Sequence, residues 1–132
     1  PIAGLVEHYD RRLAMQLLAD GFVLIFTAGT GNPFFTTDSA GCLRAIEIQA
    51  DLMLKATRVD GVYSSDPEKD PNAIFYPTLT FDEAISKNLK VMDATALTLA
   101  RDHKLPINVF NVGKEHALKQ IICGESIGTI IS

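Results

Sequence analysis

A loop rich in glycine and threonine, residues 29–38, holds the side chains of this chain that are best suited to chemistry. Gly29 and Gly31 permit positive φ and let a ligand approach the main chain closely. Short hydroxyl and amide groups stand at Thr30, Asn32, Thr36 and Thr37. The pattern predicts a binding loop for phosphate or for a phosphorylated small molecule. The alternative interpretation is a plain connection in which Asp38 only caps a helix.

Two regular elements must position this loop. The apolar run of residues 22–27 precedes it and has the length and the valine, isoleucine and phenylalanine content of a buried strand. Helical spacing over residues 39–50 follows it. The first N–H groups of a helix have no partner inside the helix and carry partial positive charge. A strand, a glycine-rich turn and a helix start would therefore aim backbone N–H groups at an anion.

Two common nucleotide motifs do not fit this loop. It lacks the Gly-x-x-x-x-Gly-Lys-Ser/Thr pattern of a P-loop. Phe34 stands where the third glycine of a dinucleotide fingerprint would be, and Asp51 precedes the next apolar run instead of ending it. A Rossmann dinucleotide site is therefore disfavoured.

A second polar segment follows another apolar run, residues 52–57. This run does not alternate between apolar and polar residues, which is typical of a strand in a parallel sheet covered on both faces. Its one charged residue, Lys55, can either reach toward phosphate or extend its ammonium group to solvent. In the loop beyond, Tyr63 can stack on a base and Asp66 can accept a hydrogen bond from a ribose hydroxyl, or both can cap turns.

The composition indicates an ordinary globular chain. It has 132 residues, 47% of them hydrophobic and 21% charged, with a formal charge of −4, and we expect one domain spanning residues 1–132. The sequence has no basic patch with interleaved aromatic residues, which disfavours nucleic acid as a partner. It also has no apolar run of membrane-spanning length, so we expect no membrane segment. The chain begins at Pro1 and not at methionine, which we interpret as a fragment of a longer protein.

The two cysteines do not indicate a metal site. Cys42 and Cys123 lack a second cysteine or a histidine at zinc-ligand spacing. We expect two reduced, buried thiols and a cytoplasmic protein. The alternating acids within residues 66–70 do not form a calcium loop, because prolines stand where such a loop needs glycine and glutamate.

Helical and extended patterns alternate along the chain, which predicts an α/β fold with a mostly parallel sheet. The expected helices are residues 10–20, 39–50, 80–87, 94–103 and a segment within 113–124 that turns Leu118, Ile121 and Ile122 inward. The expected strands are residues 22–27, 52–57, 62–63, 107–110 and 128–131. Ligands bind at the carboxyl ends of parallel strands, so the loops after Thr27 and Thr57 are expected to flank one site.

At these two loops the sequence resembles the bacterial UMP kinase family, within the amino acid kinase superfamily. Residues 28–38, Ala-Gly-Thr-Gly-Asn-Pro-Phe-Phe-Thr-Thr-Asp, are similar to the nucleotide-phosphate loop of that family. Residues 54–67 are similar to its ATP-binding segment, and residues 91–93 and 100–106 to its C-terminal helix. The resemblance covers essentially the whole chain and corresponds to slightly more than the C-terminal half of such an enzyme. It implies the C-terminal portion of a three-layer α/β/α fold.

The resemblance also implies an activity, the transfer of the γ-phosphate of ATP to UMP to give UDP and ADP in pyrimidine biosynthesis, with Mg²⁺ accompanying ATP. The implied UMP-binding residues are Thr30, Gly31, Asn32, Pro33, Phe34, Phe35, Thr36 and Thr37. The implied ATP-binding residues are Thr57, Tyr63 and Asp66, and Asp38 is the implied catalytic residue that orients a lysine of the family. The family further implies a cytoplasmic homohexamer that GTP activates and UTP inhibits.

One departure limits what this chain is expected to do alone. The Lys-Leu-Ser-Gly motif and the Gly-Gly-Gly-Asn loop of the family are absent from the 132 residues. Phosphoryl transfer depends on positioning and on neutralising charge, so we expect the isolated chain to be inactive. The alternatives are a non-catalytic nucleotide-binding module and a related kinase with a carboxylate or carbamate substrate. The Asn-Pro-Phe-Phe sequence of residues 32–35 favours UMP.

Overall fold

The computed structural model describes residues 6–132, so residues 1–5 of the expected domain lie outside the described part of the chain. The elements in chain order are α1 (Arg11–Ala19), α2 (Thr37–Glu47), β1 (Met53–Thr57), β2 (Val62–Tyr63), β3 (Phe75–Tyr76), β4 (Thr78–Leu79), α3 (Phe81–Ser86), α4 (Ala94–Asp102), β5 (Ile107–Asn111), α5 (Ala117–Ile122) and β6 (Thr129–Ile131). None of the helices in this described part has both the length and the apolar character needed to cross a bilayer.

The main sheet is mixed and mostly parallel, with the strand order β1-β5-β6-β4. β1 runs parallel to β5, with Met53 opposite Ile107, and β4 runs parallel to β6. Only the central pair, β5 and β6, is antiparallel. The short strands β2 and β3 form a separate antiparallel pair. The expectation of a mostly parallel α/β fold is therefore confirmed.

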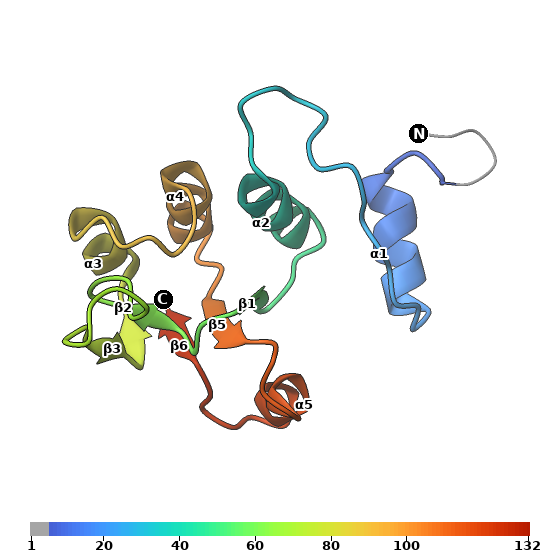
Figure 1. Cartoon of the computed structure of the whole chain (residues 1–132). Helices are drawn as coiled ribbons and strands as arrows, with labels where there is room; N and C mark the ends of the chain where they lie inside the picture. The colour runs from blue at the N-terminus through green and yellow to red at the C-terminus, as the bar shows by residue number, and fades with distance from the viewer. Residues whose placement is uncertain (1–5) are drawn as a thin grey trace.

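Helices lie on both faces of this sheet (Figure 1). α2, α3 and α4 cover one face, where Leu97 and Ile107 belong to the larger hydrophobic cluster. α5 covers the other face, where Ala117 and Ile121 contact Phe110 of β5. Each fully buried leucine, isoleucine or phenylalanine side chain stabilises the fold by roughly 1.5–3 kcal/mol. The three layers expected from the sequence are thus present.

The helix starts follow local sequence signals. Thr80 and Glu83 form a reciprocal capping box at the start of α3, which lies within the helix expected over residues 80–87. Asp93 caps α4 by accepting a hydrogen bond from the backbone N–H of Ala96 at 2.8 Å. At α2 the alternative prediction of Asp38 as the cap is wrong, because Thr36 occupies that position and Asp38 lies inside the first turn. A hydroxyl at the preceding extended residue reaches the free N–H groups better than a side chain already within the turn.

Residues 22–27 do not form the predicted buried strand. They adopt no regular structure, and Val23 and Ile25 are 92% and 87% exposed. An extended segment becomes a strand only when a neighbouring strand takes its backbone hydrogen bonds, and β1 pairs only with β5 within residues 6–132. The apolar run instead turns back alongside α1 as an unpaired segment, and the loop after it does not follow a strand end (Figure 1).

Candidate functional site

The predicted UMP loop leads directly into the first turn of α2. The Thr36 hydroxyl accepts hydrogen bonds from the N–H groups of Asp38 at 3.2 Å and Ser39 at 3.3 Å. Before it, the chain takes left-handed backbone conformations at Gly31 (φ 71°) and Phe34 (φ 69°). Glycine adopts such a conformation without the steric cost that a Cβ atom brings. These turns lead into the helix start that the sequence predicted, but Thr36 already accepts from two of the N–H groups that were expected to face an anion.

Most of this loop lies at the surface. Residues 31–37 are exposed and Thr30 is half-buried, with the Thr30 hydroxyl accepting from the N–H of Asn32 at 3.1 Å. The side chain of Phe34 is fully exposed and that of Phe35 is 55% exposed. The structure therefore keeps the predicted UMP-binding residues together on one open loop. Their contact with a nucleotide stays a prediction.

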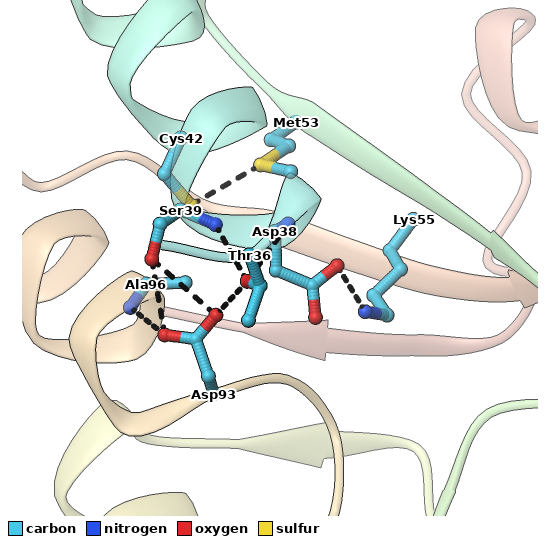
Figure 2. A network of polar contacts seen from close by, with 8 residues as sticks. All are labelled: Thr36, Asp38, Ser39, Cys42, Met53, Lys55, Asp93 and Ala96. Atoms are coloured by element: carbon cyan, nitrogen blue, oxygen red, sulfur yellow. Dashed lines mark hydrogen bonds and ion pairs between the residues drawn. The ribbon is translucent and has the colours of Figure 1, made fainter. Parts of the chain in front are cut away.

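Asp38 and Lys55 form an ion pair beside this loop (Figure 2). The Lys55 ammonium nitrogen lies 2.5 Å from Oδ1 of Asp38. The two side chains come from α2 and β1 and are 28% and 19% exposed, so the pair is partly shielded from water. Lys55 thus points to a carboxylate and not simply to solvent, which the sequence left open. Only the isolated lysine in an apolar run signalled this contact in advance.

A second carboxylate, Asp93, joins the start of α2 to the start of α4. It accepts hydrogen bonds from the Thr36 hydroxyl and from the Ser39 hydroxyl, the latter at 3.1 Å to Oδ1, in addition to capping Ala96 (Figure 2). Burial alone would raise the pKa of Asp93, but the hydrogen bonds from Thr36, Ala96 and Ser39 outweigh it and hold the pKa below its usual range. The sequence predicted a helix over residues 94–103 but not the link from Asp93 to Thr36.

Cys42 lies directly beneath this polar cluster. Its side chain is fully buried, and its sulfur is 3.4 Å from the sulfur of Met53. Burial raises the pKa of the Cys42 thiol to about 11, and the carboxylates of Asp38 and Asp93 act in the same direction. The prediction of a buried thiol is confirmed for Cys42. It is wrong for Cys123, which is exposed just beyond α5.

Thr57, the first of the predicted ATP-binding residues, lies two positions beyond Lys55. Thr57 and Lys55 are alternate residues of β1 and therefore lie on the same face of that strand. The Thr57 hydroxyl donates to the carbonyl of Val59 at 2.8 Å and holds the turn that follows the strand. The first of the predicted ATP-binding residues thus lies on the same strand face as Lys55 of the Asp38–Lys55 pair. β1 therefore links the two predicted loops, because its Lys55 pairs with Asp38 after the UMP loop and its Thr57 begins the set of predicted ATP-binding residues.

Tyr63 and Asp66 lie farther along this segment. The Tyr63 ring meets the Phe75 ring edge-on, with centroids 5.3 Å apart. Asp66 accepts from the N–H of Glu68 at 3.0 Å and lies 3.5 Å from the ammonium group of Lys69. The contact of Asp66 with the N–H of Glu68 is the one that the turn-capping alternative anticipates, whereas Tyr63 packs against a ring and caps no turn. Binding of ATP by Thr57, Tyr63 and Asp66 remains a prediction.

Asp60 provides a contact at this end of the sheet that sequence reasoning did not single out. Its carboxylate accepts from the side-chain nitrogens of Lys114 at 2.8 Å and Asn111 at 3.0 Å. The hydrogen bonds from Lys114 and Asn111 lower the pKa of Asp60. They tie the ATP segment to the end of β5. The only local signal was an Asp-Gly turn, which does not reveal partners more than fifty residues away.

The described residues do not offer a magnesium site of their own. The carboxylates next to the loop are already engaged, Asp38 by Lys55 and Asp93 by hydroxyl and N–H donors. Within residues 6–132, no group of three or more acidic, histidine or cysteine side chains could hold a metal ion.

Known relatives of this chain are uridylate kinases. It is 60% identical over 131 residues to a protein of that name from Marinobacter nauticus, covering 99% of this chain and 54% of the relative. It is 58% identical over 132 residues to that of Pectobacterium atrosepticum, covering 100% of this chain and 55% of the relative. The chain thus spans about half the length of the curated relatives it matches.

Solved structures agree with this relationship. The UMP kinase of Bacillus anthracis superimposes with a TM-score of 0.97 at 41% identity, covering 100% of this chain and 55% of that one. The uridylate kinase of Archaeoglobus fulgidus gives a TM-score of 0.74 at 31% identity, covering 93% of this chain and 58% of that one. The amino acid kinase family matches residues 1–111. The resemblance to UMP kinases is thus confirmed, and the chain belongs to the amino acid kinase family.

Proposed function

We propose that this chain forms the nucleotide-binding part of a UMP kinase that transfers the γ-phosphate of ATP to UMP, giving UDP and ADP. The observation that carries the proposal is the Asp38–Lys55 ion pair, which links the helix that follows the predicted UMP loop to the strand that leads into the predicted ATP-binding residues. The uridylate kinase relatives support the same assignment.

The residues are assigned the following roles. The loop of residues 30–37 binds UMP through its hydroxyl, amide and main-chain groups. Lys55 supplies positive charge where negative charge spreads over the phosphoryl oxygens, and Asp38 fixes the direction of that ammonium group. Thr57, Tyr63 and Asp66 bind ATP.

The activity is assigned to the complete enzyme that carries this sequence, because the chain covers 54–55% of its relatives. Mg²⁺ would accompany ATP and neutralise charge on its phosphates, because this ion is usually bound through substrate phosphates and not by a dedicated protein cage. We further propose that the complete enzyme is a cytoplasmic homohexamer that GTP activates and UTP inhibits. This part of the proposal rests on the sequence resemblance alone.

The test is UDP formation from UMP and ATP by the complete enzyme and by its Asp38→Asn variant. Because Asn keeps the shape but loses the charge that orients Lys55, we expect kcat to fall by about 100-fold or more while UMP affinity changes little. Asp20→Asn, at an exposed carboxylate beyond α1, is the control and should retain full activity. An unchanged kcat in Asp38→Asn would remove Asp38 from catalysis.

Two further measurements distinguish a UMP kinase from a kinase with a carboxylate or carbamate substrate and from a non-catalytic nucleotide-binding module. Carboxylate and carbamate substrates replace UMP in the same assay, and a phosphorylated product from one of them would identify a different kinase. The isolated 132-residue chain is expected to form no UDP above background. If the complete enzyme also makes no product but is stabilised against heat by UMP or ATP, it is a nucleotide-binding module, because a ligand that binds only the folded state raises its stability.

A further inference from the structure

Two helix N-termini meet at the Asp93 carboxylate (Figure 2). As the N-cap of α4, Asp93 accepts from the N–H of Ala96 at 2.8 Å. The same carboxylate accepts from the hydroxyls of Thr36 and Ser39, which belong to the N-cap and first turn of α2. Capping α4 requires only the bond from Ala96. The additional bond from Thr36, which lies more than fifty residues earlier in the chain, is not needed for that cap.

We propose that Asp93 is a positioning residue for phosphoryl transfer, which holds the first turn of α2 so that the UMP loop and the Asp38 carboxylate stay in register with Lys55. The inference rests on the function proposed above. As a positioning residue, Asp93 does not itself touch the reacting atoms. It acts through Thr36.

The hydrogen bonds at Thr36 explain how this control works. A threonine hydroxyl has one proton to donate and two lone pairs. Thr36 gives its proton to Asp93, so its lone pairs stay directed at the N–H groups of Asp38 and Ser39. A hydrogen bond to an ionised carboxylate is stronger than one between neutral groups. Asp93 thereby fixes the rotation of the hydroxyl that anchors Asp38.

Asp93 is well suited to this task because its own helix is rigidly held. The buried face of α4 includes Ala96, Leu97 and Ala100, which are 0%, 2% and 0% exposed. The loop of residues 30–37 is mostly exposed, and within the described chain its one side-chain hydrogen bond to an element other than α2 is the bond from Thr36 to Asp93. The carboxylate therefore connects an exposed surface loop to the core. An error of about 1 Å in positioning can reduce a rate roughly 100-fold.

The experiment separates positioning from simple helix capping. In the complete enzyme, Asp93→Ser keeps a good N-cap for α4 but is too short to reach α2. Thr36→Val removes the hydroxyl from the other side, and Thr36→Ser restores it. Asp10→Ser makes the same exchange at the N-cap of α1, where Asp10 accepts from the N–H of Leu13 at 2.8 Å, and serves as the matched control.

We expect Asp93→Ser and Thr36→Val each to lower kcat by about 10- to 100-fold and to raise KM for UMP, with KM for ATP nearly unchanged. The double variant should be scarcely worse than either single one, because both break the same link. Thr36→Ser restores the hydroxyl and should recover most of the activity that Thr36→Val loses. Asp10→Ser should keep nearly full activity. Wild-type kcat and KM in Asp93→Ser, or fully additive losses, would overturn the inference.

Hydrogen exchange provides a readout that does not depend on activity. In Asp93→Ser the N–H groups of Asp38 and Ser39 should exchange faster, while that of Ala96 stays protected by the new serine cap. Unchanged exchange at Asp38 and Ser39 would show that Asp93 does not hold the turn. An inactive wild-type enzyme would refute the UMP kinase proposal alone, since the exchange experiment still decides the role of Asp93.

Discussion

At Cys42, burial and two nearby carboxylates act on one thiol in the same direction, and its pKa rises to about 11. Cys123 carries an exposed thiol. Because the thiolate is the reactive form, iodoacetamide at pH 8 should alkylate Cys123 quickly in the native chain and leave Cys42 unmodified until the chain unfolds.

Peptide mass spectrometry of the alkylated chain gives the extent of modification at each cysteine. A Cys123→Ser variant is the control and should show almost no rapid alkylation. Comparable labelling rates at the two sites would contradict the buried environment described for Cys42.

The sequence predicted which side chains could take part in chemistry, but it did not predict which residues they contact. The glycines and hydroxyls of the loop identified a candidate site, and Asp38 stood out by its place at a helix start. The Asp38–Lys55 and Thr36–Asp93 contacts join residues 17 and 57 positions apart, and no short-range pattern encodes such distances. Lys55 was ambiguous for the same reason, since the direction of a long side chain depends on its neighbours in space.

Elements with a strong local signal formed as predicted. α3 begins at its capping box, and α4 begins after Asp93. Residues 22–27 lack a neighbouring strand within the described chain and remain irregular. In α5, Ile121 is buried as predicted, but Leu118 and Ile122 are 49% and 73% exposed. Helical periodicity gives the spacing of a face but does not show how much of it a sheet will cover.

Gly128 illustrates a local requirement set by strand pairing. It has φ of +82°, and a Cβ atom added there would lie 2.1 Å from the carbonyl oxygen of Val109. That oxygen is on β5, which pairs with β6 immediately after Gly128. Gly128→Ala should therefore force the two strands apart and lower the free energy of unfolding by about 3 kcal/mol or more.

Gly124→Ala provides the matched comparison for this prediction. Gly124 has φ of +90°, but a Cβ there would meet nothing within 4 Å. This variant should lose only about 1–2 kcal/mol from the left-handed backbone. Urea unfolding of both variants measures the difference, and equal losses would show that the close contact with Val109 has no energetic effect.

For the whole molecule, the titrating groups predict a stability that is highest near neutral pH. Hydrogen bonds hold the pKa values of Asp93 and Asp60 below their usual range in the folded chain. The unfolded chain therefore takes up protons first, so the stability these groups contribute is present above about pH 4 and is lost as the pH falls through their folded values. Cys42 acts in the opposite direction. Its pKa rises from 9.0 to about 11, so its contribution is complete below pH 9 and is lost as the pH rises toward 11.

Urea midpoints measured from pH 3 to pH 10.5 should consequently form a plateau between about pH 5 and pH 8.5 and fall on both sides. One variant tests each side of this pH profile. Asp93→Asn should reduce the decrease of the urea midpoint at acid pH, because the amide does not titrate. It should also lower the midpoint on the plateau, because the hydroxyls of Thr36 and Ser39 are left with one acceptor oxygen. Cys42→Ala should flatten the alkaline arm above pH 9 because it removes the buried thiol. If Asp93→Asn retained the full acid dependence, the carboxylate joining α2 and α4 would not contribute to it, and the loss would have to come from more exposed acids such as Asp60.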